Sequence, residues 1–193
     1  MKTFLSLLCA FCITLWQWSC TVESNVDILE IEFVSLSFEE VSTRIGPEMM
    51  AVLLFSFIDG NGKIGASEGN DSQSQIHYVW EKELPDGAFE PLTFEYENED
   101  GSKEVIIFGD STPVPYGAVM DKSSANNKTL RGTIKIPLML PLFLHDNIEN
   151  MRIAFYISDR DGKNSIPKGE ERIDDDVPRP AYTRIFHINE LQY

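Results

Sequence analysis

The sequence predicts an all-β protein, a single two-sheet sandwich of about eight or nine short antiparallel strands. The chain has 193 residues and is 42% hydrophobic, which suits one globular domain with its own core. Its apolar runs have the length of strands and are separated by turn signals. No segment repeats apolar residues with helical spacing over three turns.

The N-terminal part of this domain is expected to contain two strands. Ile28–Phe38 alternates apolar and polar residues, and the alternation slips near Val34, which predicts a β-bulge. Ala51–Ile58 is almost continuously apolar, as in a central strand that is buried on both faces. The intervening segment Glu39–Met50 has the length of a short helix, but Gly46-Pro47 would interrupt it.

Two hairpins are expected in the middle of the chain. Ile76–Leu84 alternates apolar and polar side chains, and Phe89–Tyr96 returns after the turn Pro85-Asp86-Gly87. Asp100-Gly101 forms the second turn, and Glu104–Phe108 follows it. The Asp-Gly pairs predict hairpins because the two residues tolerate the positive φ angles of tight turns.

The remaining strands are expected in the C-terminal half, at Thr129–Leu140, Met151–Ser158 and Arg184–Ile188. The segments 110–128 and 166–182 contain proline and aspartate and are expected to form long loops.

The first 19 residues differ in composition from the rest of the chain. Lys2 is the only charged residue before Glu23, and Phe4–Trp18 is a short apolar run, which together are the layout of an export signal. A spanning helix needs about 20 apolar residues, so the run is too short to cross a membrane. The predicted organisation is a signal peptide at 1–19, a lipidated tether at 20–27 and the sandwich domain at 28–193.

All three cysteines lie near the N-terminus, and the chain has none after Cys20. The segment ending in Ser19-Cys20 resembles a bacterial lipoprotein signal, although Gln17 and Trp18 depart from the usual Leu-Ala/Ser pattern. The resemblance implies acyl chains on Cys20 that anchor the protein in the cell envelope as an outer-membrane lipoprotein. Ordinary cleavage near Ser19, which would leave a free thiol, is the alternative.

The charge of the chain limits its partners. Acidic residues number 31 and basic residues 16, a formal charge of −15 that becomes −16 when Lys2 leaves with the signal. Such a surface repels phosphate backbones, so no nucleic-acid partner is expected. Because no polybasic patch is present, the lipid on Cys20 and not surface charge is expected to hold the protein at a membrane.

Two motifs for cofactor binding or catalysis occur without the structure that they require. Gly60–Gly65 satisfies the dinucleotide pattern G-x-G-x-x-G, and Gly65–Gly69 satisfies the nucleophile pattern G-x-S-x-G around Ser67. Both motifs need a helix that begins at the loop, and the polar residues that follow predict none. The three histidines lack the spacing of zinc ligands. We therefore expect no cofactor and no enzymatic activity.

The loop after Ala51–Ile58 has oxygen-bearing side chains between glycines. This composition suits Ca²⁺, which takes about six to eight oxygen ligands, and the weak candidates are Asp59, Asn61, Glu68 and Asp71. The EF-hand spacing fails because a lysine occupies a ligand position. A tight turn, in which glycines allow positive φ and Asp59 caps its own backbone, explains the same residues without a metal and is the interpretation that we favour.

A resemblance to a known family rests on three segments. Phe57–Gly65 (FIDGNGKIG) resembles the F-x-D-G-D-G-D-I-G signature of Bacteroidetes-type lipoproteins of unknown activity. Asp159–Ser165 (DRDGKNS) is similar to their D-R-x-G-x-x-S turn, and Gly132–Ile134 fits their G-x-I segment. The resemblance covers most of residues 28–175 and implies an immunoglobulin-like sandwich behind a lipid anchor. Asn61 and Lys63 stand where that family has acidic residues.

The sequence leaves three functions open. The first is an anchored binding or scaffolding module for an envelope protein or a glycan, or a Ca²⁺-stabilised surface adhesin; the sugar-stacking candidates are Trp80 with Tyr78, or Tyr116 and Tyr182. The second and less favoured function is a hydrolase, for which the acidic clusters look more like solvated hairpin faces. The third is a structural subunit of an envelope complex, which a large exposed apolar patch would support.

Overall fold

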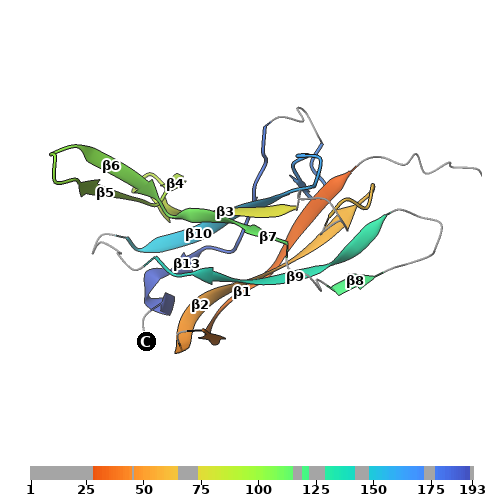
Figure 1. The fold of residues 1–193 in the computed structure, drawn as a ribbon, viewed down its shortest axis with the longest axis horizontal. Coiled ribbons are helices and arrows are strands. Elements are labelled where there is room, and N and C mark those ends of the chain that lie inside the picture. The colour runs from red at the N-terminus through yellow and green to blue at the C-terminus, as the bar shows by residue number, and fades with distance from the viewer. Residues whose placement is uncertain are drawn as a thin grey trace, which may run out of the picture.

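A computed structural model of the chain describes residues 28–44, 46–64, 74–114, 119–121, 129–141, 148–171 and 177–191. These residues form thirteen β-strands and one short 3-10 helix, η2 (Ile188–Leu191), arranged as two sheets and a separate hairpin (Figure 1). The all-β sandwich prediction is confirmed. The strands outnumber the eight or nine expected because five of them have only two or three residues. The predicted signal peptide and tether, including Cys20, lie outside the described residues.

The first sheet has five strands, with β2 (Gly46–Asp59) at its centre. β1 (Leu29–Thr43) and β9 (Leu130–Met139) flank β2, and both run antiparallel to it. β8 (Val119–Asp121) lies beyond β9, and β11 (Ile166–Pro167) pairs in parallel with β1 at the opposite edge. The apolar run predicted to be a central strand therefore occupies the centre of this sheet.

The second sheet is built on the antiparallel pair β3 (Gln75–Glu83) and β10 (Asn150–Ser158). Two short strands pair with the other side of β10, namely β12 (Ala181–Tyr182) and β13 (Phe186–His187). Two more pair with the other side of β3, namely β4 (Phe89–Pro91) and β7 (Gly109–Pro113). The outer edge of β3 is thus covered in two pieces that come from different parts of the chain.

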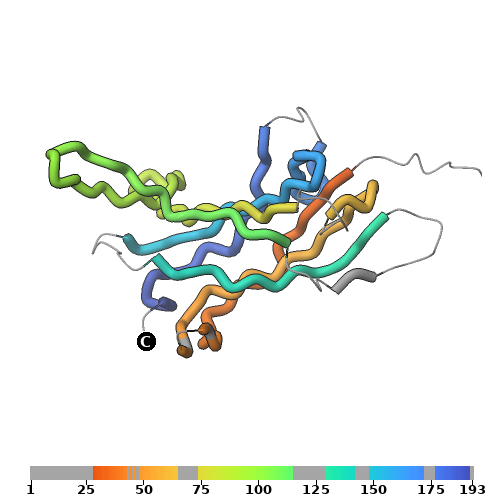
Figure 2. The backbone as a smooth tube through the Cα atoms, in the orientation of Figure 1, coloured from red at the N-terminus to blue at the C-terminus, as the bar shows by residue number. Residues whose placement is uncertain are grey.

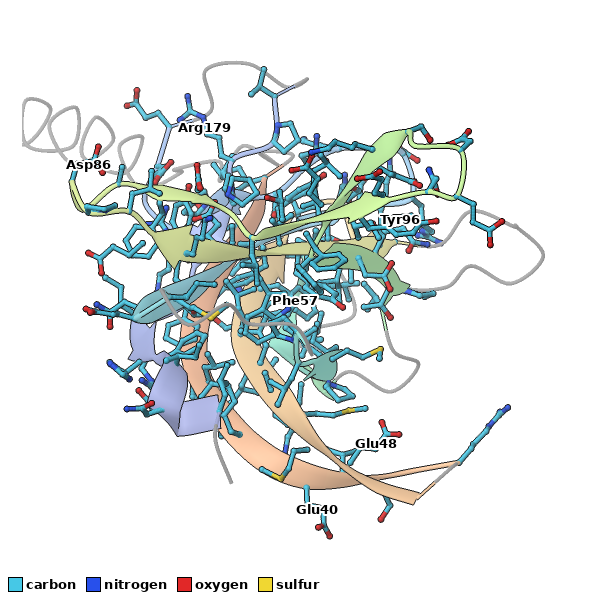
Figure 3. All side chains as sticks on the ribbon, turned by 90° about the vertical axis from the view of Figure 1, so that its left-hand side faces the viewer. Glu40, Glu48, Phe57, Asp86, Tyr96 and Arg179 are labelled. Atoms are coloured by element: carbon cyan, nitrogen blue, oxygen red, sulfur yellow. The ribbon has the colours of Figure 1, made fainter. Side chains whose placement is uncertain are left out.

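The core lies between the two sheets and is made by the alternation of side chains along each strand. Phe55 of β2 meets Phe155 of β10 with ring centroids 5.1 Å apart. Phe186 meets Trp80 at 6.0 Å and Phe38 of β1 at 5.2 Å. Side chains from both sheets fill the space around Phe57 (Figure 3). Burial of these large apolar groups is the main force that holds the sheets together.

The bulge predicted near Val34 is confirmed. The pairing of β1 with β2 shifts register between Phe33 and Ser35. Leu29 and Ile31 are buried before the shift, and Leu36 is buried after it. The extra residue shifts the alternation of side chains by one position, so that apolar side chains before and after Val34 face the core.

The described part of Glu39–Met50 is strand except for Arg44, which lies in the turn, and the short helix considered there is wrong. β1 continues to Thr43, which pairs with Gly46 at the start of β2. Gly46 has a φ of 136°, which other residues adopt at a cost. The two strands extend past the core, and Glu40 and Glu48 lie near their tips (Figure 3).

The separate hairpin consists of β5 (Thr93–Glu97) and β6 (Lys103–Ile107), which pair only with each other among the described strands. It projects beyond the end of the second sheet, as the ribbon and the backbone tube both show (Figures 1 and 2). Its turn at Asp100-Gly101 is where the sequence predicts one, and Gly101 has a φ of 80°. The predicted strand Phe89–Tyr96, however, is divided at Leu92 into β4 and β5.

Candidate functional site

The loop after β2 is organised by the carboxylate of Asp59, which is 1% exposed. Asp59 Oδ1 accepts hydrogen bonds from the backbone N–H groups of Asn61 and Gly62, at 3.1 Å each. Asp59 Oδ2 accepts one from the N–H of Ile64 at 2.7 Å. Burial raises the pKa of Asp59, and these N–H donors oppose the rise. The bonds are those of a turn that is capped by its own first residue, as the interpretation without a metal expects.

A second loop of the same design follows β10. The buried carboxylate of Asp159 accepts hydrogen bonds from the N–H groups of Asp161 at 2.8 Å and Lys163 at 2.9 Å. Residues 59–63 and 159–163 share the pattern Asp-x-Asn/Asp-Gly-Lys, and the glycines have φ of 71° and 81°. Asp159 is not among the site residues expected from the sequence, and the pattern that it shares with residues 59–63 is the signal that identifies it.

The two loops contact each other across the end of the sandwich. Asn61 Nδ2 lies 3.5 Å from Asp159 Oδ2, and Lys63 forms an ion pair with Asp161. Arg160 Nε donates to the carbonyl oxygen of Lys63 at 2.8 Å. Because β2 and β10 belong to different sheets, these contacts tie the sheets together at this end.

Two of the four calcium candidates can be placed. Asp59 and Asn61 lie in the first loop, where Asn61 Oδ1 accepts a hydrogen bond from the N–H of Lys63 at 3.1 Å. Glu68, Asp71 and Ser67 lie outside the described residues. Within the described ranges, no three or more Asp, Glu, His or Cys side chains gather in a way that could hold a metal ion. The Asp59 oxygens are engaged by three backbone donors, so the described loop gives the carboxylate a structural role.

Only one of the described aromatic candidates for sugar stacking is exposed. Trp80 is 1% exposed and Tyr78 is also buried, so neither ring is available to a ligand. Tyr116 lies outside the described residues. Tyr182 is exposed, and the guanidinium of Arg152 lies 3.8 Å from its ring centroid and 4.1 Å from that of Phe89. This stack ties three strands together on the outer face of the second sheet.

His77 joins three strands on the same outer face. Its Nδ1 lies 2.6 Å from Ser111 Oγ, its Nε2 lies 2.9 Å from Ser158 Oγ, and its ring stacks on Tyr156. Ser158 Oγ donates its proton to Asn164 Oδ1 at 3.0 Å, so His77 Nε2 must donate to Ser158. In this tautomer Nδ1 accepts the proton of Ser111, so the ring links the two hydroxyl groups and does not act on Ser158 as a general base. Burial lowers the pKa of His77, which suits a neutral ring.

The hairpin of β5 and β6 enters and leaves the second sheet opposite Trp80. The backbone N–H of Trp80 donates a hydrogen bond to the carbonyl oxygen of Phe108 at 2.9 Å. The carbonyl oxygen of Trp80 accepts one from the backbone N–H of Leu92 at 2.7 Å. The chain therefore leaves the sheet edge after β4, forms the hairpin and rejoins the same edge as β7. This insertion explains why the predicted strand is divided at Leu92.

The hairpin exposes an unusual run of apolar side chains. Val105 is 61% exposed, Ile106 is 46% exposed and Ile107 is 54% exposed. Tyr96, on the projecting ribbon in Figure 3, is exposed as well. Three consecutive exposed apolar residues are a feature of binding surfaces and aggregation-prone edges. The sequence predicts Glu104–Phe108 as the second strand of a hairpin, but a run of apolar residues does not show whether that strand is covered.

Comparisons of the chain with family models, with curated proteins and with solved structures found no match. Within the part of the chain that the structure describes, no helix is long and apolar enough to cross a membrane. The candidate functional features are thus the paired aspartate loops and the projecting hairpin.

Proposed function

We propose that the protein is a lipid-anchored binding or scaffolding module of the bacterial cell envelope, and that the hairpin is its contact surface. The export signal and Cys20 support the anchor. The observation that carries the binding proposal is the exposed run Val105, Ile106 and Ile107 on a hairpin that leaves the sandwich. The sandwich then serves as the rigid base that presents this hairpin away from the membrane.

The hairpin is costly unless it has a partner. An isolated two-stranded hairpin is marginally stable in water. Burial of apolar surface contributes a favourable free energy of about 25 cal/mol per Å², which the exposed side chains of the hairpin lack. The outer edge of β6, with which no other described strand pairs, invites pairing with other chains. A partner that covers the apolar run recovers this free energy, which favours binding as the role of the hairpin.

A catalytic role has less support. The described residues offer two serine–histidine contacts, from His77 to Ser158 and from His77 to Ser111, and both join neighbouring strands of the second sheet. The buried aspartates are held by backbone donors in the two loops. These arrangements stabilise turns and strands, so we propose a protein without enzymatic activity.

The anchor is tested by Cys20→Ser. We expect this variant to be released from membranes, because it lacks the thiol that would carry the acyl chains and the chain has no polybasic patch. Fractionation of cells that express the variant or the wild-type protein measures the effect. A variant that sediments with membranes as the wild-type protein does would show that the lipoprotein proposal is wrong.

The contact surface is tested by photo-crosslinking in intact cells. A photoreactive amino acid replaces Val105 in one variant and Val177 in a control variant, since Val177 is 59% exposed but lies outside the hairpin. We expect a discrete crosslinked product from position 105 and little or none from position 177, because the partner covers the hairpin. Equal yields from both positions would contradict the hairpin as the contact surface.

A further inference from the structure

The hydrogen bonds at the two ends of the hairpin determine which backbone groups of β6 face outward. At the turn, the N–H of Asn98 donates to the carbonyl oxygen of Ser102 at 2.8 Å. At the base, the N–H of Phe108 donates to the carbonyl oxygen of Leu92 at 2.9 Å. Hydrogen-bonded and non-hydrogen-bonded pairs alternate along an antiparallel ladder. The even-numbered residues of β6 therefore bond to β5, and the odd-numbered ones do not.

The outward edge of β6 consequently presents the N–H and C=O groups of Lys103, Val105 and Ile107. In the ladder these residues lie opposite Glu97, Glu95 and Thr93. No other described strand pairs with this edge. The edge has the backbone pattern that an extended polypeptide segment completes when it adds a strand to a sheet.

Apart from Lys103, the side chains of β6 are apolar or acidic. Val105 and Ile107 lie on one face of the hairpin, and Glu104 and Ile106 lie on the other. Residues 93–107 contain five acidic side chains and a single basic one, Lys103, whose Nζ is paired with Glu95 Oε1 at 2.8 Å. This composition attracts basic groups and disfavours a second acidic hairpin of the same kind.

We propose that the outer edge of β6 receives an extended segment of a partner protein in which apolar and basic side chains alternate. The inference rests on the proposed function and specifies the partner of the same surface. The apolar side chains of the segment pack beside Val105 and Ile107, and its basic side chains lie on the other face beside Glu104. The backbone of the segment bonds to the outward groups of β6, which gives affinity with little dependence on its remaining sequence.

The probe is a blocked, fluorescent peptide of about eight residues in which valine and lysine alternate, long enough to cover a five-residue strand. It is titrated into the purified full-length chain and followed by anisotropy and by amide NMR. We expect saturable binding, with the largest shifts at the outward amides of Lys103, Val105 and Ile107 and smaller ones at Glu104 and Ile106. A valine–glutamate peptide of equal length should not bind.

Two variants of one position form the matched pair. Val105→Pro removes an outward N–H and leaves the β5–β6 ladder intact, so the peptide should bind about tenfold or more weakly. Val105→Thr keeps the N–H and the branched shape and should bind within about threefold of the wild-type chain. Equal binding by Val105→Pro, or NMR shifts spread over all acidic loops, would overturn strand addition.

The other outcomes separate the two proposals. A dimer of the free chain that Val105→Pro abolishes would show that the occupant is a second copy, and the proposed partner would be wrong. If the peptide fails to bind but position 105 still crosslinks in cells, strand addition is wrong and the proposed binding function is supported. If the peptide binds but position 105 captures no more than position 177, the proposed function falls.

Discussion

Asp59→Ala is expected to lower the free energy of unfolding by about 3 kcal/mol, which corresponds to a fall in Tm of roughly 6–12 °C for a domain of this size. The carboxylate is buried and accepts three backbone hydrogen bonds, so its removal leaves the N–H of the buried Ile64 without its acceptor. Thermal unfolding measures the change. Asp161→Ala is the control, since that side chain is exposed and its ion pair with Lys63 should contribute about 1 kcal/mol or less.

The same experiment tests the calcium alternative. A site that binds only the folded state adds about 2.7 kcal/mol of stability when the ligand is at a hundredfold excess over Kd. We expect less than about a degree of difference between millimolar Ca²⁺ and excess chelator, and an equal effect of Asp59→Ala in both. A clear rise in Tm with Ca²⁺ that disappears in Asp59→Ala would show that the loop is a metal site.

Gly109→Ala is expected to cost about 2–3 kcal/mol of stability because β7 approaches β3 too closely for a side chain. A Cβ at this position would lie 2.5 Å from the carbonyl oxygen of Tyr78 and 3.1 Å from Val79 Cγ2. The carbonyl belongs to the backbone of β3 and moves only if the sheet is disturbed. Denaturant unfolding gives the free-energy difference between the variant and the wild-type chain.

Gly87→Ala is the control for this prediction. Gly87 has a φ of 82° but open space around the added Cβ, so the variant should lose only about 1 kcal/mol from backbone strain. An effect of Gly109→Ala no larger than that of Gly87→Ala would contradict the close approach of β7 to β3.

Much of the sandwich could be predicted from local pattern. The apolar run Ala51–Ile58 predicts the central strand, and the change of parity at Val34 predicts the bulge, because both depend only on which side chains must face a core. The burial of Trp80 follows from the same alternation along β3. The turns at Asp86-Gly87 and Asp100-Gly101 follow from residues that tolerate positive φ.

Other features depend on tertiary contacts that local pattern does not encode. β11 and β12 have two residues each, and they are strands only because β1 and β10 lie beside them. The local sequence of Glu39–Thr43 does not favour a strand over a helix. The segment is a strand because it pairs with the start of β2. The contact between the two aspartate loops joins residues about one hundred positions apart in the chain.

The projecting hairpin illustrates the same limit at the candidate site. Its turn is visible in the sequence, and its apolar residues have the pattern of a covered strand. Whether Val105 and Ile107 face the core or the solvent depends on where the chain leaves the edge of β3 after β4, at the backbone hydrogen bonds of Trp80 with Leu92 and Phe108. The exposure that carries the proposed function therefore becomes visible only in three dimensions.

The measurement that tests this account most directly is the thermal unfolding of a chain that lacks the hairpin. Leu92 and Phe108 are hydrogen-bonded partners, so an Asn-Gly turn can replace Thr93–Ile107 and connect them. If the hairpin serves binding, the variant should keep cooperative unfolding with a Tm within about 3 °C of the wild-type chain. A fall in Tm of more than about 10 °C, or loss of cooperative unfolding, would show that the hairpin is part of the fold and would contradict its role as a binding surface.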